Sequence, residues 1–204
     1  MIMTDTKAAS DTTRESILDA AAERFRQYGY GKTTMAEIAT DASMSAANLY
    51  RYFENKRDIG AGLALRCFAQ KEFLLAEVVQ RSDLNAAAKL EAYLLTLLRY
   101  THGQCHNQPR IHELIEDVAT HRPDIVTRKL QGEHQFIAAI LEEGCRSGEF
   151  SIDNIKTTAA TVMNMSLVFG MPFFMQAHSL ERYEAMARDT ARLLVRGLAN
   201  RDSK

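Results

Sequence analysis

The sequence predicts an all-α protein in which an N-terminal head of three helices precedes a larger helical part. Apolar residues recur at helical spacing along most of the chain, and long stretches lack the alternation that is typical of strands. Only three of the 204 residues are proline, so long helices can form without interruption. Within residues 31–56, two short helices flank a tight turn. The length suffices for one large or two small packed units.

The first helix is expected between Thr12 and Tyr28. Residues 1–11 before it are polar and small, and we expect them to form a flexible tail. Thr12 with Glu15 fits a capping box, and apolar residues at helical spacing follow. Gly29 would then end the helix.

The segment GKTTMAEIATDASMSAANLYRYFENK, residues 31–56, carries the signals of a helix-turn-helix. Thr34 precedes MAEIA and Glu37 follows three residues later, which is the pattern of a capping box. Residues 41–44 break the apolar pattern and would form the turn. Ser45 is the expected N-cap of the second helix, which we place at residues 46–53.

The surface of this second helix suits nucleic acid. Small side chains at its start allow a close approach to a groove wall, Asn and Arg can read base edges, and hydroxyls and Lys can hold phosphates. The residues expected at DNA are Thr33, Thr34, Ser45, Ala46, Ala47, Asn48, Tyr50, Arg51, Tyr52 and Lys56. On residue chemistry alone, a helical hairpin that packs in a core and touches no DNA remains an alternative.

The stretch RESILDAAAERFRQYGYGKTTMAEIATDASMSAANLYRYFENKRDI resembles the DNA-binding domain of TetR/AcrR-family transcriptional regulators over about a quarter of the chain. The resemblance implies a homodimer that represses transcription at a palindromic DNA operator and is released by a small molecule. It also implies about nine helices in all, three of them in the head. The family often has glycine where this chain has Ser43 and Ala47. Ser43 suggests a turn without positive φ.

Further helices are predicted wherever apolar residues continue at helical spacing between polar or glycine-containing runs. Pro172 should kink or end the helix in which it lies. The expected ranges are 56–80, 84–100, 111–119, 126–145, 155–177 and 179–200. No break suggests another linker, so we expect a helix-turn-helix domain at 12–55 and an effector-binding and dimerisation domain at 56–200.

Net charge and composition bear on how the protein would bind DNA and on where it is located. The formal net charge is −1, so the strongly basic footprint of many DNA-binding proteins is missing. DNA binding would then depend on a few placed cations and show a shallow salt dependence. Three widely spaced cysteines do not indicate disulfides, which favours the reducing cytoplasm as the location. No signal peptide is evident, and no apolar run approaches the ~20 residues of a membrane helix.

A second candidate site lies in the larger domain, where Met and aromatic residues recur on neighbouring helices. Such residues suit an adaptable, mainly apolar pocket for an apolar or aromatic effector, although the same pattern also describes an ordinary core. The candidate effector residues are Tyr93, Leu97, Tyr100, Phe136, Met163, Met165, Phe169 and Phe173.

The last two helices are apolar beyond one narrow face. That surplus would either fill the core of one chain or form a four-helix interface between two chains, and the resemblance favours the interface. The candidate interface residues are Leu167, Phe174, Met186, Leu193 and Gly197.

The segment HGQCHNQPRIHE raises the alternative of a metal-responsive repressor, because imidazole and thiolate together suit zinc or copper. Its candidate ligands are His102, Cys105, His106, His112 and Glu113. Their spacing matches no closed zinc motif, and His102 and His106 share a face only if a helix continues between them. We therefore assign no metal and no cofactor, and interpret the segment as a polar connection.

No P-loop, G-x-S-x-G, H-E-x-x-H or dinucleotide fingerprint occurs, so no catalytic residues are predicted and we expect a non-enzyme. A helical enzyme or ligand carrier without DNA binding is the alternative from a different class. Failure to bind any DNA would favour that alternative.

Overall fold

The computed structural model describes residues 2–107 and 110–199. Within these residues, all regular secondary structure is helical apart from one isolated β-bridge. A single antiparallel bridge joins Phe150 and Ala199. The prediction of an all-α fold is confirmed. A search of the described helices finds none that is long and apolar enough to span a membrane.

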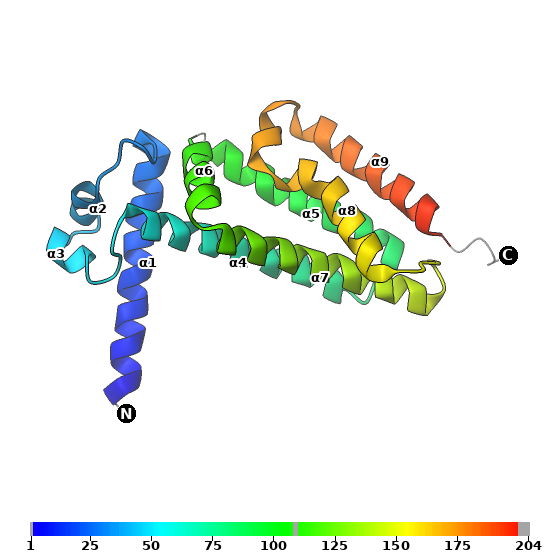
Figure 1. The fold of residues 1–204 in the computed structure, drawn as a ribbon, viewed down its shortest axis with the longest axis horizontal. Coiled ribbons are helices and arrows are strands. Elements are labelled where there is room, and N and C mark those ends of the chain that lie inside the picture. Colours follow the sequence, from blue (N-terminus) through cyan, green and yellow to red (C-terminus); the bar gives the residue numbers. More distant parts are fainter. Residues whose placement is uncertain (1, 108–109, 200–204) are drawn as a thin grey trace. The chain divides into compact units, whose positions relative to one another are not determined.

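The chain forms two compact units (Figure 1). The first unit, called the head below, comprises residues 1–67 and 107–126; the second comprises residues 68–106 and 127–204. This division does not follow the expected boundary at residue 55, because a helix from the middle of the chain packs with the head. Residue 200, the expected end of the second domain, lies outside the described residues.

The head contains α1 (Ile2–Tyr28), α2 (Met35–Asp41), α3 (Ala46–Leu49), the start of α4 (Lys56–Gln80), and α6 (Ile111–His121). Their apolar faces enclose one small core. Its buried members include Ile17, Leu18, Phe25, Ile38, Leu49, Phe53, Ile59, Leu114 and Val118. Of the apolar residues predicted at helical spacing in the first helix, Ile17, Ala21 and Phe25 are buried in this core, whereas Tyr28 is 51% exposed.

Helix α1 begins at Ile2 rather than near Thr12, so the expected capping box of Thr12 and Glu15 does not start it. Residues 2–11 contain neither proline nor glycine. Extending an existing helix adds one hydrogen bond per residue fixed, whereas starting a helix is costly. The helix therefore continues through a polar stretch that we expected to be a tail; its flexibility stays a prediction.

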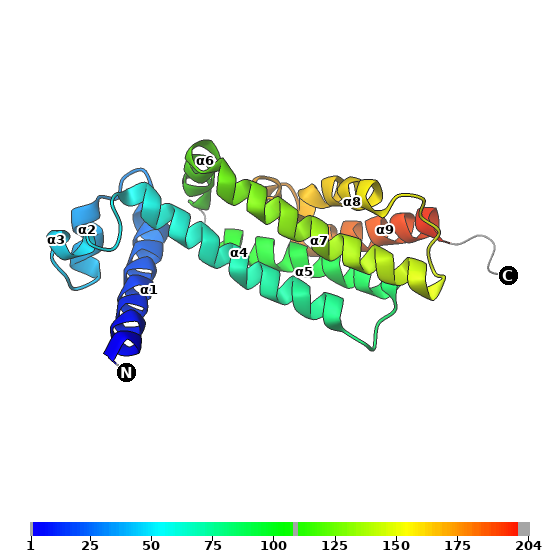
Figure 2. The same ribbon diagram turned by 60° about the horizontal axis from the view of Figure 1, so that its bottom comes forward.

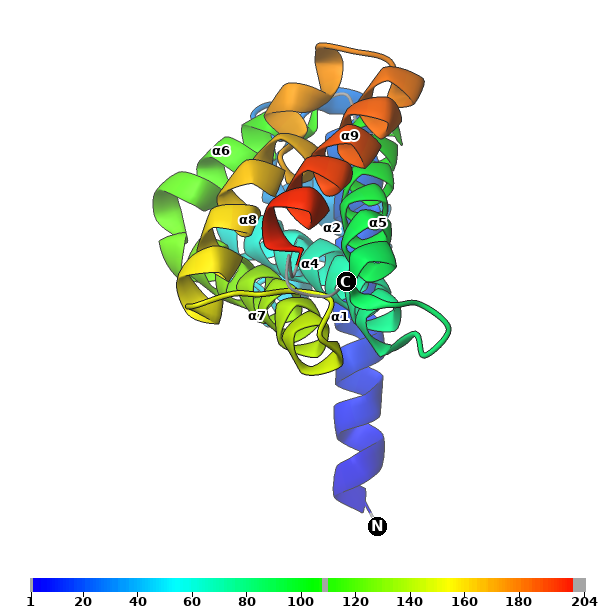
Figure 3. The same ribbon diagram turned by 90° about the vertical axis from the view of Figure 1, so that its right-hand side faces the viewer.

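The second unit is a bundle built from the rest of α4, α5 (Ala86–Asn107), α7 (Pro123–Ser147), α8 (Ile155–Gly170), the 3₁₀ helix η1 (Pro172–Gln176) and α9 (Leu180–Leu198). Helices α5 and α7 run alongside α4 in Figure 2, and α8 lies beside α9 in Figures 1 and 3. The core side chains include Leu75, Leu90, Leu94, Leu98, Ile137, Leu141, Val162 and Tyr183.

Two helix ends in this unit bear on the predictions. Helix α8 stops at Gly170 and Pro172 opens η1, as expected for a proline that cannot continue a helix. Helix α5 instead continues to Asn107, past the expected end at Tyr100. The break expected from Pro109 falls on residues 108–109, which lie outside the described residues.

Candidate nucleic-acid interface

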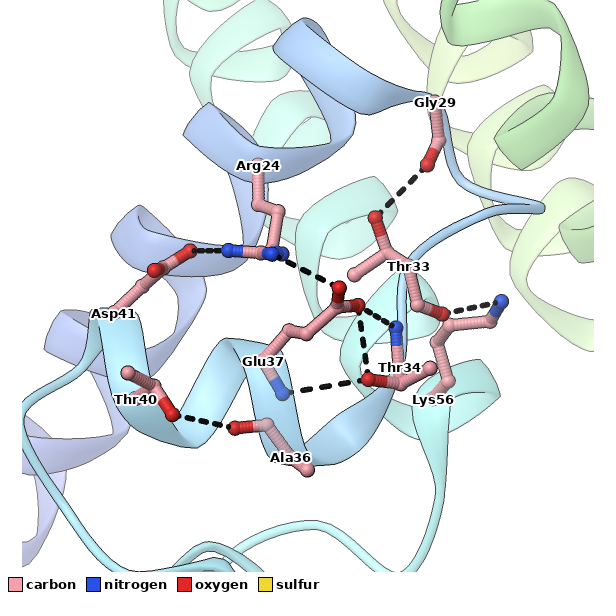
Figure 4. A network of polar contacts seen from close by, with 9 residues as sticks. All are labelled: Arg24, Gly29, Thr33, Thr34, Ala36, Glu37, Thr40, Asp41 and Lys56. Atoms are coloured by element: carbon pink, nitrogen blue, oxygen red, sulfur yellow. Dashed lines mark hydrogen bonds and ion pairs between the residues drawn. The ribbon is translucent and has the colours of Figure 1, made fainter.

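Helix α2 is fixed at its start by the predicted capping box (Figure 4). The backbone N–H of Glu37 donates to Thr34 Oγ1 at 3.4 Å, and the backbone N–H of Thr34 donates to Glu37 Oε2 at 2.9 Å. The Thr34 backbone and hydroxyl donors, with the Arg24 guanidinium, lower the pKa of Glu37. An ionised carboxylate is the form that closes the box.

Arg24 ties α1 to α2. Its Nη1 donates to Asp41 Oδ2 at 2.7 Å, and its Nη2 lies 3.1 Å from Glu37 Oε1 (Figure 4). One guanidinium thus spans both ends of α2, because Glu37 is in its first turn and Asp41 is its last residue. The role of Arg24 was not predicted from the sequence, because its partners are 13 and 17 residues away and no local pattern pairs them.

The turn between α2 and α3 is a Schellman motif. The N–H of Met44 donates to the carbonyl of Ala39, and the N–H of Ser43 donates to that of Thr40. This geometry requires a left-handed residue, and Ser43 has φ of +55°. The expectation that serine indicates a turn without positive φ is wrong, because the hydrogen bonds of the helix end impose the conformation on a residue that disfavours it.

Helix α3 begins at the predicted cap, with the Asn48 N–H donating to Ser45 Oγ at 3.2 Å. It was expected to reach Phe53, but it ends at Leu49, and the chain continues in tighter turns. Buried Leu49 and Phe53 anchor this segment in the head core.

The anchored segment leaves most of the predicted DNA-contacting side chains at the surface. Tyr50 is 53% exposed. The residues classed as exposed are Thr34, Ser45, Ala46, Ala47, Tyr50 and Arg51, whereas Asn48 and Tyr52 are partly buried.

Lys56 and Thr33 hold the loop before α2. The ammonium of Lys56 donates to the carbonyls of Tyr30, Gly31 and Thr33 at 2.8, 3.3 and 2.9 Å, and lies 4.6 Å from the centre of the Tyr30 ring. Buried Thr33 donates its hydroxyl to the carbonyl of Gly29 at 2.9 Å (Figure 4). An ammonium has three donors, and here each has a carbonyl acceptor. Both side chains are therefore engaged within the head.

The same loop rests on α6. Tyr30 Oη donates to Asp117 Oδ2 at 2.9 Å, and the N–H of Gly31 donates to Glu113 Oε2 at 2.6 Å. Burial, and then the bond to Asp117, raise the pKa of Tyr30, so its hydroxyl stays a donor. Neither of these contacts was predicted from the sequence, because more than 80 residues separate each carboxylate from the loop.

Most of the candidate effector residues are buried or partly buried in the second unit, whereas two are exposed. Tyr93, Leu97 and Phe169 are buried in the core of the second unit, and Phe136 and Met163 pack against it. Tyr100 is partly buried, and its hydroxyl donates to Gln70 Oε1 at 3.3 Å.

Met165 and Phe173 do not join the other candidate effector residues, since both are exposed. Two residues along a helix turn a side chain through about 200°, so Met165 faces away from Met163. Phe173 lies in η1 rather than in a continued helix.

The candidate interface residues lie on α8, η1 and α9. Leu193 is 66% exposed, Phe174 and Gly197 are also exposed, and Leu167 and Met186 are partly buried. A methyl group added at Gly197 would meet nothing within 4 Å. Leu193 and Gly197 are four residues apart and therefore neighbours on one face of α9.

The metal-responsive alternative is not supported. His102 and His106 do share a helix face, with ring centres 6.4 Å apart, because α5 continues through Gly103. Burial raises the pKa of Cys105 to about 11, which disfavours the thiolate that binds metal. Among the described side chains, no three His, Cys, Asp or Glu residues gather as a metal site requires.

Comparison with known proteins agrees with this geometry. Residues 17–63 match the family described as "Bacterial regulatory proteins, tetR family". Residues 86–190, more than half of the chain, match the family described as "Tetracyclin repressor-like, C-terminal domain".

Two relatives illustrate how far the similarity extends. The transcriptional repressor BepR of Brucella suis is 39% identical over 74 residues, which is 36% of this chain and 35% of that protein. The match thus spans about a third of its length. The transcriptional regulator UidR of Escherichia coli is 23% identical over 201 residues, 97% of this chain and 98% of that protein.

Among solved structures, FadR from Bacillus subtilis in complex with stearoyl-CoA superposes with a TM-score of 0.66. It is 22% identical and covers 90% of this chain and 98% of its own. At this identity the likeness concerns the fold alone.

Proposed function

This chain belongs to the tetR family of bacterial regulatory proteins and is a helix-turn-helix DNA-binding transcriptional regulator; from this premise we propose that it is a homodimeric repressor released from a palindromic operator by a small molecule. The observation that carries the proposal is the exposed surface of α3 and the turn after it, held on a rigidly braced head. We also infer that the chain has no enzymatic activity and acts in the cytoplasm, where bacterial DNA lies.

The proposed roles at DNA follow the chemistry of the side chains that this surface exposes. Ala46 and Ala47 let the backbone approach base edges, where Asn48 can contact a base. Arg51 reaches a base or a phosphate, and the remaining contacts are to the DNA backbone through Thr34, Ser45, Tyr50 and Tyr52. Lys56 and Thr33 act indirectly, since their donors hold the loop that precedes α2.

Dimerisation follows from the apolar side chains that α8, η1 and α9 leave uncovered. A two-fold dimer would bury Leu193 and Phe174 and place Gly197 where a second helix can approach closely. The two recognition segments would then meet successive turns of DNA about 34 Å apart.

Release by an effector requires a molecule that binds one state of the dimer better than the other. The apolar set of Tyr93, Leu97, Phe136, Met163 and Phe169 supports binding within the second unit. The solved FadR of Bacillus subtilis holds stearoyl-CoA, a ligand with a long apolar part. A coupling of about 1–3 kcal/mol between effector and operator would change operator affinity by roughly 5- to 150-fold.

The test is selection of bound sequences from a random duplex pool, followed by titration of the selected duplex at two salt concentrations. A pseudo-palindrome with half-sites one turn apart is the expected result. Lack of any enrichment, with mass spectrometry showing no co-purified small molecule, would overturn the DNA-binding proposal.

Variants connect the binding to particular side chains. Tyr50→Ala should weaken binding to every duplex roughly tenfold without unfolding the protein, since the ring is exposed. Asn48→Ala should instead cost about 1–3 kcal/mol of discrimination at one base pair. Arg51→Ala and Arg26→Ala remove the same charge from exposed positions of the head, so Arg26→Ala is the matched control, expected to leave operator binding unchanged.

A further inference from the structure

The second unit contains two lysines that share one carboxylate inside the bundle. Lys71 of α4 is 3% exposed, and Lys129 and Glu133 of α7 are 6% and 3% exposed. Glu133 Oε1 lies 2.6 Å from the ammonium nitrogen of Lys71 and 3.3 Å from that of Lys129. Two positive charges thus face one negative charge. We call these three side chains the buried lysine cluster.

The two ammonium groups of the cluster also have N–H donors that form no hydrogen bond among the described residues. Each ammonium carries three N–H groups, and among the described residues each forms one hydrogen bond, to Glu133. Lys71 additionally faces the Phe68 ring at 5.3 Å. Burial, and then the charge of Lys129, lower the pKa of Lys71 to about 8. Partly buried Glu72 has a weaker influence of opposite sign and forms no ion pair with either lysine within the described part of the chain.

A buried hydroxyl of the same unit lacks a partner. Tyr93 of α5 is fully buried, and its Oη has no hydrogen-bond partner among the described residues. Burial, and then the charge of Glu133, raise the pKa of Tyr93, so its hydroxyl stays a donor. A buried donor without an acceptor is rare in folded proteins, because it loses its bond to water.

A second buried lysine in the same unit shows that the surplus is particular to this cluster. Lys89 of α5 is also nearly inaccessible, and its ammonium contacts both oxygens of Glu143 at 2.8 and 2.6 Å. That pair is balanced one to one. The surplus charge around Lys71 and Lys129 therefore calls for an anion, since a buried charge is normally paired.

We propose that the buried lysine cluster, with the hydroxyl of Tyr93, binds the anionic group of the effector, a carboxylate or a phosphate carried on an apolar body. The inference rests on the proposed function, because it names the chemical class of the molecule that the second unit binds. The apolar body would lie along Leu97, Phe136 and Met163, which belong to the same core or pack against it. Charge-assisted hydrogen bonds from two ammonium groups and one hydroxyl would fix the anion.

Calorimetry on the full chain tests the proposal with four matched series of short, medium and long alkyl chains: carboxylates, phosphates, alcohols and amines. One anionic series should bind at least roughly tenfold more tightly than the alcohol of equal length. The carboxylate and phosphate series distinguish the two possible anions. An alcohol or amine that binds as tightly as both anions, or the failure of every anion to bind, would overturn the proposal.

Variants show whether the cluster is responsible. Lys71→Met leaves Lys129 and Glu133 as a balanced pair, so the protein should fold while anion affinity falls roughly tenfold or more. Lys129→Met leaves Lys71 and Glu133 as the pair and should have the same effect. Lys89→Met is the control and should leave the preference for anions unchanged. An unchanged preference in both cluster variants would contradict the proposal, whereas operator binding by the unliganded protein is measured separately and would stand.

Discussion

Lys56 and Lys71 lie on the same helix, α4, yet the two units surround their ammonium groups differently. In the head, Lys56 donates to three carbonyls of one loop, so its donors are all used. In the second unit, Lys71 shares the Glu133 carboxylate with Lys129. The first lysine completes a rigid support, whereas the second leaves positive charge for a ligand. Under the proposal above, the head is preformed, whereas the second unit is completed when an anionic effector binds.

The largest expected change in stability comes from removing the ammonium group of Lys56 in the head. Lys56→Met leaves three loop carbonyls without their charged donor and should lower the free energy of unfolding by about 2–3 kcal/mol. Urea denaturation measures this change. Lys32→Met, at an exposed position of the same loop, should change it by less than about 0.5 kcal/mol. Equal effects of the two variants would contradict the supporting role of Lys56.

The second unit has a comparable rigid point in its apolar packing. A methyl group added at Gly144 would clash with the buried Phe150 ring. Gly144→Ala should therefore cost about 2 kcal/mol of stability, in the range of overpacked cores. Thermal denaturation tests this, with Gly103→Ala as the control.

Gly103 is also helical, and an added methyl group there meets nothing within 4 Å. The control should therefore gain up to about 1 kcal/mol. A Gly144→Ala variant as stable as the parent would show that the ring moves aside freely.

Within the head, the left-handed serine is a local weakness in an otherwise preformed support. Ser43→Gly should raise the free energy of unfolding by about 1 kcal/mol, because glycine adopts φ of +55° without steric cost. Ala42→Gly is the matched control and should lower it, since Ala42 has an ordinary φ of −80°. Destabilisation by Ser43→Gly would mean that the serine side chain makes a contact worth more than the strain.

The smallest effect is a pH dependence from Lys71. Its pKa is about 8 in the folded chain, whereas the ordinary lysine pKa of 10.5 applies to the unfolded chain. The unfolded state therefore binds more protons between these values, and stability from this group rises with pH. From pH 8 to 9 the gain should be about 1 kcal/mol relative to Lys71→Met. Cys105, whose raised pKa of about 11 acts in the opposite direction above pH 9, limits the useful window.

Parallel urea titrations of the parent and Lys71→Met at both pH values measure this difference. No difference between the two proteins would place Lys71 in a balanced environment. That result would remove the contrast with Lys56.

The sequence by itself determined the helical class and the helix-turn-helix, because their signals are local. Thr34 and Glu37 are three residues apart, and Ser45 caps the helix that follows it, so each contact can be predicted from spacing. It also determined that Ile17, Ala21 and Phe25 lie on a buried face of α1, although Tyr28, at the same helical spacing, is exposed. Helix ends were predicted less well. Helices α1 and α5 are longer than predicted because neither residues 2–11 nor residues 101–107 contain a proline, whereas α3 ends early, at Leu49.

Only the tertiary structure decided what the charged side chains do. The partners of Lys56, Tyr30 and Lys71 lie 23 or more residues away along the chain, and no periodic pattern connects them. Lys56 was predicted at DNA because its type and position suit a phosphate, yet the folded loop brings three carbonyls to it first. The periodicity of apolar residues shows which face of a helix is buried. The number of buried positive and negative groups that contact one another depends instead on which helices pack together, and the packing of the whole unit determines that.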